Sequence, residues 1–478
     1  MNRWFLIGLN IVILGVVLAT IPMVLRARKP YLENNRGVEA LNAQRYDEAI
    51  TLLKGAISEN PDNPQFKENL LAAYNSKAVA LANKGQVIDA LAFYEKALEM
   101  QPQDERLKQT LLRNYISSLN NLAVERSNAH QFPQAQQFFE RASVSLGKLN
   151  DQKVREEIRH NYSALLTLWG AELMKRNQVQ EARVSFKQSL DLDTSNSMAH
   201  LYMGDLGYEE NDYVLAKTHY AAALPLDTEN RAYLANRLQM IEDESRVESN
   251  FKRAVDPKGH FIIHHVEYSN GVSVPELLGI LSSAYETIGK DLGIYPARAV
   301  NVKLYTAKDF ANIAKLPEWA IGIFDGKMRL KVDEVQSAPS QVKDLLFHEY
   351  THAVLAMNVK QKVPAWFHEG LAQLMEPQFR ENPREQAQMR DALARNQLDF
   401  ASLQNSFKDI ESKGDAENAY LLSKYFLAFL NRKYGHEKLT NWIKNIAAEE
   451  KFEEAFKSVY GLALKDAQEA WIKAQSRE

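Results

Sequence analysis

The sequence predicts an α-helical solenoid followed by an α+β domain, with a single transmembrane helix in front of both. Three observations support this fold class: an uncharged N-terminal run, small residues that recur at constant offsets, and alternating strand and helix patterns in the second half. We expect a transmembrane anchor at 1–29, the solenoid at 30–245, a linker at 246–258 and the α+β domain at 259–478. A chain of 478 residues is long enough for two or three domains.

Composition excludes several classes of site. Lysine and arginine together number 58 against 61 aspartates and glutamates, so the formal net charge of −3 gives no basic field for a nucleic-acid partner. There is no cysteine, which excludes disulfides, thiolate zinc sites and cysteine nucleophiles. A bound metal ion must therefore be held by histidine, aspartate or glutamate.

The N-terminal segment predicts a membrane anchor. From Trp4 to Leu25 there are 22 residues without a charge, and a helix needs about 20 residues to cross the hydrocarbon core. A cleavable signal peptide is the alternative, but the run is long for such a peptide and no clean small-x-small cleavage site follows it. We therefore expect an uncleaved single-pass anchor.

Two opposing arguments bear on the orientation of this anchor. Basic residues at positions 26, 28 and 29 follow the run, and only Arg3 and the amino terminus precede it, so the positive-inside rule keeps the body cytoplasmic. Against this, one N-terminal span before a large body is a common plan of exported, tethered bacterial proteins, and long domains translocate largely regardless of charge. We expect the body to be extracytoplasmic, in the periplasm.

Small residues recur at fixed offsets five times after the anchor. The first copy has Gly37, Ala49 and Ala56, followed by Pro61. The corresponding small residues of the later copies are Ala78, Ala90 and Ala97; Ala123, Ala135 and Ala142; Gly170, Ala182 and Ser189; and Gly204, Ala216 and Ala223. Such residues are typical of the points where the two helices of a hairpin cross closely.

This pattern resembles the tetratricopeptide repeat, with apolar second-helix positions at Tyr46, Phe93, Phe138 and Phe186. The second-helix alanines are 41, 45, 47 and 34 residues apart, so the earlier hairpins must have longer helices or loops. The resemblance implies a concave face that binds a protein or peptide partner. A purely structural spacer is the alternative interpretation.

The second half alternates strand and helix patterns after the charged linker "ESRVESNFKRAVDPKGH". "HFIIHHVEY" and "AVNVKLYT" predict strands, and "AIGIFDGKMRLKV" predicts a hairpin that turns at Asp325 and Gly326. His264 and His265 are neighbours in the first strand and point to opposite faces, so we expect core and surface roles for them rather than a shared site.

The helix predicted from about Pro339 to Val359 carries the pattern HEYTH. Because a helix has 3.6 residues per turn, His348 and His352 lie on one face and can direct both imidazoles to one tetrahedral ion. Glu349 is offset by about 100° and can reach a metal-bound water rather than the metal. Chance alone gives this pattern in roughly one or two chains per hundred of this composition, so a third ligand is needed to support the site.

The segment "VPAWFHEGLAQLME" supplies a third ligand. Glu369 lies in an otherwise apolar helix start, where a buried carboxylate needs a partner, and a cation held by two histidines is a good one. Gly370 and Ala372 are small, so we expect this helix to pack tightly against the first. His368 is the competing ligand, but one residue away on a helix it points elsewhere, and we prefer Glu369.

Together, "HEYTH" and "PAWFHEGLAQ" resemble the gluzincin metallopeptidases, specifically the peptidase-MA-like domains with a two-His, one-Glu zinc site. The resemblance covers about residues 256–478, and the 16 residues between His352 and Glu369 are fewer than in thermolysin. It implies a zincin-like α+β domain in which His348, His352 and Glu369 bind Zn²⁺ and Glu349 is the general base and proton shuttle.

The resemblance also implies a donor for the oxyanion that forms when a peptide carbonyl is attacked. Tyr420 in "NAYLLSKY" is the candidate for this catalytic role, with Tyr425 behind it, and packing in an apolar helix is the alternative for either residue. The "AIGIF" segment at 320–324 would supply main-chain hydrogen bonds to an extended substrate lying antiparallel to it.

Two functions remain open from the sequence. The first is a membrane-anchored zinc metallopeptidase, expected to be an endopeptidase, whose repeats recruit or present a protein or peptide substrate. The second is a non-catalytic interaction scaffold with an inactive metallopeptidase-like domain. The presence of all four catalytic-type residues favours the first, because a decayed site would usually have lost at least one of them.

Overall fold

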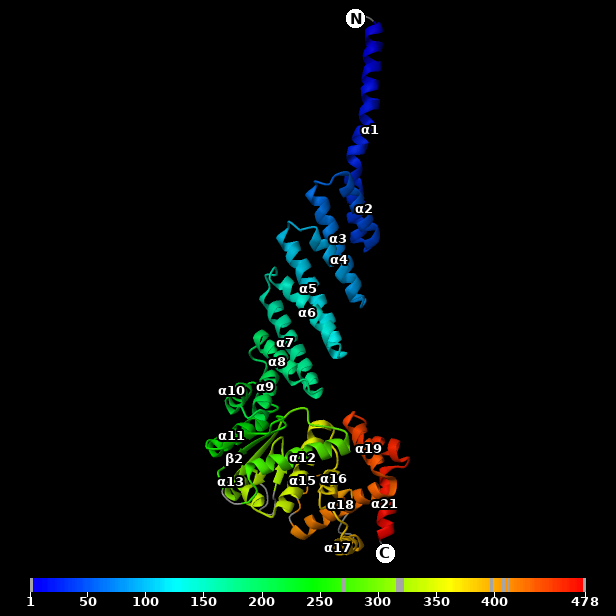
Figure 1. Cartoon of the computed structure of the whole chain (residues 1–478). Coiled ribbons are helices and arrows are strands. Elements are labelled where there is room, and N and C mark those ends of the chain that lie inside the picture. The colour runs from blue at the N-terminus through cyan, green and yellow to red at the C-terminus, as the bar shows by residue number, and fades with distance from the viewer. Residues whose placement is uncertain are drawn as a thin grey trace. The chain divides into compact units, whose positions relative to one another are not determined.

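The computed structural model describes side chains from residue 23 onward and the backbone of residues 3–268, 271–314, 322–395, 399–405, 407, 410 and 412–475. The chain divides into two compact units, Met1–Tyr202 and Met203–Glu478. The first unit is helical, and the second combines helices with a five-stranded sheet (Figure 1). The predicted helical solenoid is confirmed, and the α+β part is confirmed as helices with a small mixed sheet.

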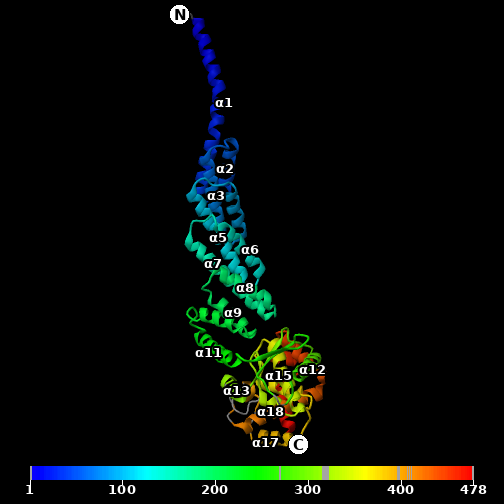
Figure 2. The same cartoon turned by 60° about the vertical axis from the view of Figure 1, so that its left-hand side comes forward.

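Antiparallel helix pairs follow one another along the first unit (Figure 1; Figure 2). Its helices are α1 (Arg3–Asn42), α2 (Tyr46–Glu59), α3 (Pro64–Asn83), α4 (Val87–Glu99), α5 (Glu105–Asn128), α6 (Phe132–Leu146), α7 (Gln152–Lys175), α8 (Val179–Leu192) and the start of α9 (Ser197–Glu209). Helices α5 and α7 have 24 residues each. They are the longer helices that the repeat spacings of 45 and 47 residues predicted.

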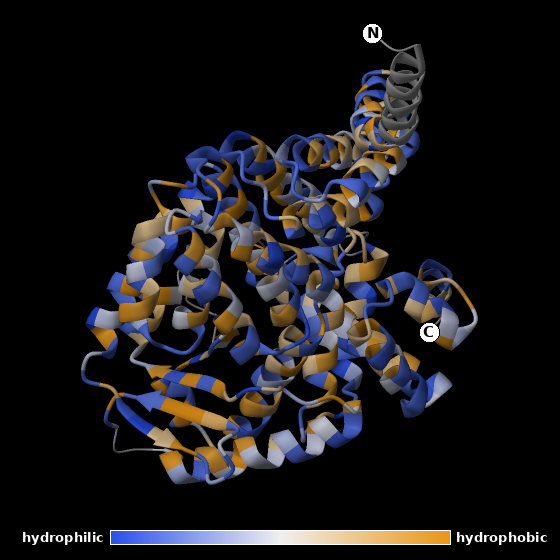
Figure 3. Cartoon of the chain, turned by 90° about the horizontal axis from the view of Figure 1, so that it is seen from above, coloured by the Kyte–Doolittle hydropathy of each residue, from blue (hydrophilic) through white to orange (hydrophobic). Residues whose placement is uncertain are grey.

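Small residues lie where the two helices of a hairpin cross, as expected. A Cβ on Gly37 would come 2.7 Å from Cγ of Leu53 in the partner helix, and a Cβ on Gly170 would come 2.4 Å from the Phe186 ring. The second-helix alanines at the crossing points are fully buried: Ala49, Ala90, Ala135 and Ala182. Hydrophobic and hydrophilic residues alternate along most described helices (Figure 3), as expected for helices with one buried face.

A row of asparagine pairs joins the first helices of successive repeats. The three bonds run from Nδ2 to Oδ1: Asn69 to Asn34 at 2.7 Å, Asn114 to Asn75 at 3.0 Å and Asn161 to Asn120 at 3.0 Å. Every donor asparagine precedes the small crossing residue of its hairpin by nine positions. Every acceptor asparagine, which lies in the preceding hairpin, precedes the crossing residue of that hairpin by three positions. The same register between neighbouring repeats is therefore fixed three times by the same bond.

Within the part of the chain that the structure describes, no helix is both long enough and apolar enough to cross a membrane. This finding overturns the predicted single-pass anchor at 1–29 and the membrane localisation that was expected from it. The uncharged run at 4–25 lies in α1, which continues through the charged residues that follow and ends at Asn42 as a helix of the first repeat. The side chains of residues 1–22 lie outside the described residues.

The second unit opens with helices and continues as an α+β domain. After α9 its helices are α10 (Tyr213–Ala223), α11 (Arg231–Glu248), α12 (Val274–Leu292), α13 (Ala307–Ala314), α14 (Val332–Val335), α15 (Pro339–Asn358), α16 (Ala365–Leu374), α17 (Pro383–Ala394), α18 (Lys413–Tyr434), α19 (His436–Ala447), α20 (Phe452–Tyr460) and α21 (Leu464–Gln475), with a 3-10 turn at Ser402–Gln404. Its strands are β1 (Lys252–Val255), β2 (Phe261–His265), β3 (Val300–Tyr305), β4 (Gly322–Phe324) and β5 (Met328–Lys331).

The five strands form one mixed sheet in the order β1-β2-β3-β5-β4. Strands β2, β3 and β5 run parallel, and the edge strands β1 and β4 are antiparallel to their neighbours. In β3, Val300, Val302 and Leu304 belong to the main core together with residues of α12 and α15. The alternate residues, among them Lys303 and Tyr305, face the other side of the sheet and are also buried. Both faces of the central strand are therefore covered.

Residues 246–258, which the sequence led us to expect as a linker, comprise the end of α11 and strand β1. Strand β1 pairs with β2 from Lys252 opposite His265 to Val255 opposite Ile262. The fifth repeat copy belongs to the second unit, where a Cβ on Gly204 would come 2.5 Å from the Tyr220 ring. The two compact units therefore divide at 202/203, before the fifth copy is complete.

Candidate metal centre

Helix α15 carries two histidines and packs one apolar face into the core. Pro339 stands in its first turn, where a proline is well tolerated, and apolar residues such as Val342 and Leu346 turn one face into the core. The four-residue spacing places His348 and His352 on the same side, with their Nε2 atoms 3.2 Å apart. Their side chains are only 17% and 14% exposed.

Helix α16 brings a third group to the two histidines. Oε2 of Glu369 lies 3.5 Å from Nε2 of His348 and 3.5 Å from Nε2 of His352. One ligand atom from each of the three residues lies within 4.8 Å of the others. Helix α16 contacts α15, as expected, but Gly370 faces α18: a Cβ there would come 2.4 Å from the carbonyl oxygen of Ser423.

The donor set of this group suits a zinc ion. Two imidazole nitrogens and one carboxylate oxygen are ligands found in catalytic zinc sites, which keep a further position open. Oε2 of Glu369 is buried and has no hydrogen-bond partner among the described residues. Burying a carboxylate oxygen in this way costs free energy, and a cation between the three side chains would offset that cost.

The charges of the three residues act on one another. Burial opposes a charge on His348, but the neighbouring carboxylates of Glu369 and Glu376 outweigh burial and raise the pKa of His348 to about 10. Burial also opposes a charge on Glu369, and the two histidines outweigh it and hold the pKa of this carboxyl well below its ordinary value. The group therefore favours positive charge beside Glu369, as a cation site requires.

Glu349 follows His348 on α15 and is 5% exposed. Its carboxylate lies against the edge strand β4, because a Cβ on Gly322 would come 2.5 Å from Oε1 of Glu349. The missing side chain at Gly322 thus allows the strand and the carboxylate to approach closely. Of the "AIGIF" segment, Gly322–Phe324 form β4, whereas residues 320 and 321 lie outside the described residues.

The two tyrosines of α18 have different surroundings. Burial, followed by the charges of Glu369 and Glu349, raises the pKa of Tyr420 above its ordinary value, so its phenol lies within the influence of both carboxylates. Tyr425 instead donates a 2.8 Å hydrogen bond to Glu385 in the first turn of α17. Of the two, Tyr420 is the residue whose pKa responds to the carboxylates of the candidate site.

The other histidines considered from the sequence do not converge with the three candidate ligands. His368 is mostly buried, and burial together with the neighbouring His352 lowers its pKa to about 4. Burial and the charge of Lys303 likewise lower the pKa of His264 in β2 to about 4. Nδ1 of His265 lies 2.8 Å from the carbonyl oxygen of the next residue.

Glu376 is a residue of this centre that the sequence reasoning missed. Its Oε1 lies 2.8 Å from Nδ1 of His348, the ring nitrogen opposite the one that faces Glu369. A carboxylate on the second nitrogen fixes the tautomer and the orientation of an imidazole that binds a metal. Glu376 stands seven residues after Glu369. It lies two residues beyond the end of α16, so helical spacing alone did not point to it.

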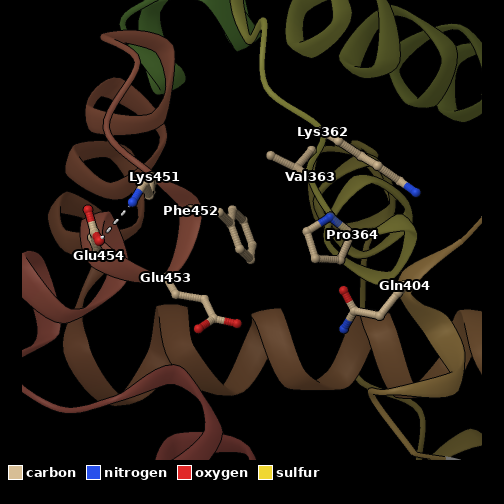
Figure 4. Close-up of a pocket in the computed structure, with 8 residues that line it drawn as sticks. All are labelled: Lys362, Val363, Pro364, Gln404, Lys451, Phe452, Glu453 and Glu454. Carbon is tan, nitrogen blue, oxygen red and sulfur yellow. Dashed lines mark hydrogen bonds and ion pairs between the residues drawn. The ribbon is translucent and has the colours of Figure 1, made fainter.

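A surface pocket with a volume of about 420 Å³ lies at the starts of α16 and α20. Figure 4 shows Phe452 and Pro364 facing each other across it. Its lining residues are Lys362, Val363, Pro364, Gln404, Lys451, Phe452, Glu453 and Glu454. The His348–His352–Glu369 group does not line this pocket, so it is the chemistry of the side chains, not the size of a cavity, that identifies the candidate site.

Comparison with known families identifies both parts of the chain. Residues 282–475 match the Peptidase MA superfamily, and residues 40–109 match the tetratricopeptide repeat. The chain therefore carries tetratricopeptide repeats and a Peptidase MA superfamily domain. His348, His352, Glu349, Glu369 and Tyr420 all fall within the Peptidase MA match at 282–475.

Curated relatives match over limited segments. Human "Anaphase-promoting complex subunit 7" is 24% identical over 233 residues, which is 46% of this chain and 40% of that protein. "Uncharacterized protein YhcO" of Bacillus subtilis is 29% identical over 153 residues, 30% of this chain and 42% of that protein. "Type IV pilus assembly protein PilF" of Pseudomonas aeruginosa is 27% identical over 108 residues, 23% of this chain and 41% of that protein. The chain thus spans less than half the length of these relatives.

Among solved structures, the Pseudomonas aeruginosa pilF protein matches with a TM-score of 0.20 and 18% identity, covering 47% of this chain and 94% of that chain. The tetratricopeptide-repeat domain of P58(IPK) matches with a TM-score of 0.21 and 12% identity, covering 93% of this chain and 99% of that chain.

Proposed function

We propose that this protein is a zinc-dependent peptidase, in which His348, His352 and Glu369 hold the metal ion and Glu349 is the general base. The observation that carries the proposal is the convergence of two imidazoles and the half-buried carboxylate of Glu369 within 4.8 Å, with the buried carboxylate of Glu349 on the same helix as the two histidines. The match to the Peptidase MA superfamily supports it.

A zinc ion held by His348, His352 and Glu369 would lower the pKa of a water molecule and polarise the substrate carbonyl. Glu349 then accepts the proton as the water attacks the peptide carbonyl, and the same carboxylate returns the proton to the leaving amine. Tyr420 donates its phenolic hydrogen to the oxygen that becomes negative in the transition state. Glu376 keeps the His348 ring in the orientation that directs Nε2 to the metal.

Strand β4 is the surface on which we expect the substrate to lie. It is one of the two edge strands of the sheet, so the side that pairs with no described strand can hydrogen-bond an extended peptide that runs antiparallel to it. Gly322 brings this strand against Glu349, and the scissile bond would therefore lie beside the base. The substrate class is an extended protein or peptide segment, and the repeats recruit or present it.

The first test compares zinc content and peptide hydrolysis in three variants. Wild type should bind about one zinc ion per chain. Glu349→Gln should keep the zinc and lose hydrolysis by about 100-fold or more, because it loses the basic carboxylate but not a ligand. Glu369→Gln should lose zinc affinity and activity together. His368→Gln is the matched control, since it changes the rejected ligand on the same helix.

Elemental analysis and cleavage of casein or a quenched peptide library provide the measurements. A folded wild-type chain that cannot be loaded with zinc would refute the metal site. Zinc binding without any hydrolysis would favour a non-catalytic scaffold instead. If Glu349→Gln empties the site while Glu369→Gln does not, the assignment of base and ligand is wrong.

A further inference from the structure

Five charged side chains are buried together between α11 and the face of the sheet opposite the main core. Glu244 and Arg329 are 0% exposed, Lys303 and Lys327 are 1% exposed, and Glu248 is 7% exposed. We call these five residues the α11 ion cluster. None of them takes part in the proposed chemistry, and the sequence did not single them out.

Glu244 is the acceptor at the centre of the α11 ion cluster. Its Oε1 lies 2.8 Å from Nη2 of Arg329, and its Oε2 lies 3.1 Å from Nζ of Lys327. The hydroxyls of Tyr208 and Tyr213 each donate a 2.6 Å hydrogen bond to the same carboxylate. All four bonds come from described neighbours, so this carboxylate is fully engaged although it has no access to solvent.

The two cations that pair with Glu244, Arg329 and Lys327, belong to the β4–β5 hairpin. Arg329 is in β5 and pairs across the strands with Ile323 of β4. Its Nε also lies 3.1 Å from each carboxylate oxygen of Asp325, in the turn of the same hairpin. Lys327 stands between that turn and β5. Glu244 therefore holds the hairpin at two points, Arg329 and Lys327.

The same hairpin forms one wall of the candidate site. Gly322 precedes Ile323 in β4 and approaches Oε1 of Glu349 so closely that a Cβ would come within 2.5 Å of it. Successive strand residues point to opposite faces, so Ile323 faces the α11 side while Gly322 faces α15. A shift of the hairpin on the α11 side would thus move the strand that lies beside the base.

We propose that Glu244 is a positioning residue, which through Arg329 and Lys327 holds strand β4 at the distance from Glu349 that substrate binding requires. The proposal rests on the proposed peptidase function, and it assigns α11 a role in substrate binding. Glu244 touches neither the three metal-binding side chains nor Glu349 in any described contact, and it acts only through the hairpin.

The first test measures hydrogen–deuterium exchange of the main-chain amides at 322–331 in the full chain. Glu244→Gln should speed exchange there by about tenfold or more, because the hairpin loses its anchor, with little change in α15. Glu242→Gln is the matched control, since it removes an exposed carboxylate of the same helix that pairs with Lys217 at 3.5 Å. Exchange at 322–331 equal to that of wild type would overturn the proposal.

The second test separates positioning from general loss of stability. For the best-cleaved peptide of a quenched library, Glu244→Gln should raise KM by about fivefold or more with a smaller change in kcat, and zinc content should stay at the wild-type value. Leu439→Ala, a core change in α19, serves as a variant of reduced stability. An equal rise of KM in both variants would contradict the positioning role.

Lys327→Met provides a second variant should Glu244→Gln fail to fold. It removes one attachment and leaves the Glu244–Arg329 pair, so exchange at 322–331 should rise by a smaller factor; an unchanged rate there would refute the role of this attachment. The exchange measurement does not depend on hydrolysis. An inactive wild type with faster hairpin exchange in Glu244→Gln would therefore refute the peptidase function alone, whereas an active wild type with unchanged exchange would refute the positioning role alone.

Discussion

The orientation of individual side chains decides what the His–His–Glu group can do. His348 is held through both ring nitrogens, with Nε2 3.5 Å from Glu369 and Nδ1 2.8 Å from Glu376. A ring fixed in this way directs one lone pair to the metal position without searching among rotamers. Loss of Glu376 should therefore weaken zinc binding more than it slows the chemical step.

We expect Glu376→Gln to weaken zinc binding by about 10–100-fold, because the neutral amide is a poorer partner for the His348 ring. Competition with a chelating zinc indicator measures this directly. Glu381→Gln is a suitable control, since it removes a more exposed carboxylate near Glu376 that pairs with Arg432 at 2.6 Å. Unchanged zinc affinity in Glu376→Gln would show that the hydrogen bond does not orient the ligand.

A second residue-scale prediction concerns acid stability. Burial opposes ionisation of Glu244, but Lys327, Arg329 and the hydroxyls of Tyr208 and Tyr213 outweigh it and lower its pKa from 4.5 to about 2. Because the folded-state pKa is the lower one, this carboxylate stabilises the fold fully above pH 4.5 and loses that contribution as the pH falls toward 2. The contribution is at most about 3 kcal/mol.

Denaturant unfolding of the full chain at several pH values between 3 and 6 checks this expectation. Wild type should lose stability more steeply on acidification than Glu244→Gln, which carries no titratable group at this position. Lys327 does not add to the same effect, because burial lowers its pKa to about 8, far above this range. Parallel pH profiles for the two proteins would rule out Glu244 as a source of the acid loss.

The sequence predicts residues of the centre well where the geometry is local. The four-residue spacing of His348 and His352 determines their relative positions within one helix, and the third candidate ligand, Glu369, follows on the next helix. Glu376 was missed because it lies beyond the end of α16, where helical spacing alone does not fix a position. The neighbour of Gly370 was also mistaken, since which helix Gly370 faces is a tertiary property.

At the scale of elements, the alternating pattern of β3 shows what a sequence leaves open. "VNVKLY" alternates apolar and polar residues, a pattern typical of a strand with one solvated face. In the structure all six residues are buried. The polar face is covered because α11 packs on it and pairs Glu248 with Lys303. In the same way, Glu244 of α11 pairs with Arg329 of the neighbouring hairpin. Long-range charge pairing of this kind has no signature in the strand itself.

Strand β4 gives the prediction that belongs to this scale. Gly322→Ala should reduce hydrolysis by about tenfold or more and leave zinc content unchanged, because the new methyl group would displace either the strand or the Glu349 carboxylate. Steady-state kinetics and elemental analysis measure the two effects. Gly279→Ala is the control, since a Cβ there in α12 meets nothing within 4 Å. Equal activity in both variants would mean that β4 does not border the reacting groups.

At the scale of the whole molecule, the boundary between the two compact units decides which helices belong to the unit that carries the candidate site. The sequence placed a linker at 246–258, and limited proteolysis would have been expected to cut there. The structure has α11 and β1 in that segment, and α11 supplies two carboxylates to the buried face of the sheet. We therefore propose that the unit carrying the candidate site begins near residue 203.

This division predicts how fragments should behave. A fragment of residues 203–478 should fold cooperatively and retain zinc binding, because it keeps Glu244 and Glu248. A fragment of residues 259–478 should be unstable, since it leaves Lys303, Lys327 and Arg329 without their carboxylates, and each broken buried pair costs about 3–5 kcal/mol. Thermal unfolding followed by circular dichroism distinguishes the two.

A matched comparison separates the charges from the loss of surface. In the 203–478 fragment, replacing Glu244 and Glu248 together by glutamine removes the carboxylates but keeps α11 in place. If this double variant is destabilised nearly as much as the 259–478 fragment, the charge pairs are what join α11 to the sheet. If the shorter fragment folds and binds zinc as well as the longer one, α11 is dispensable, and the proposed boundary near residue 203 is wrong.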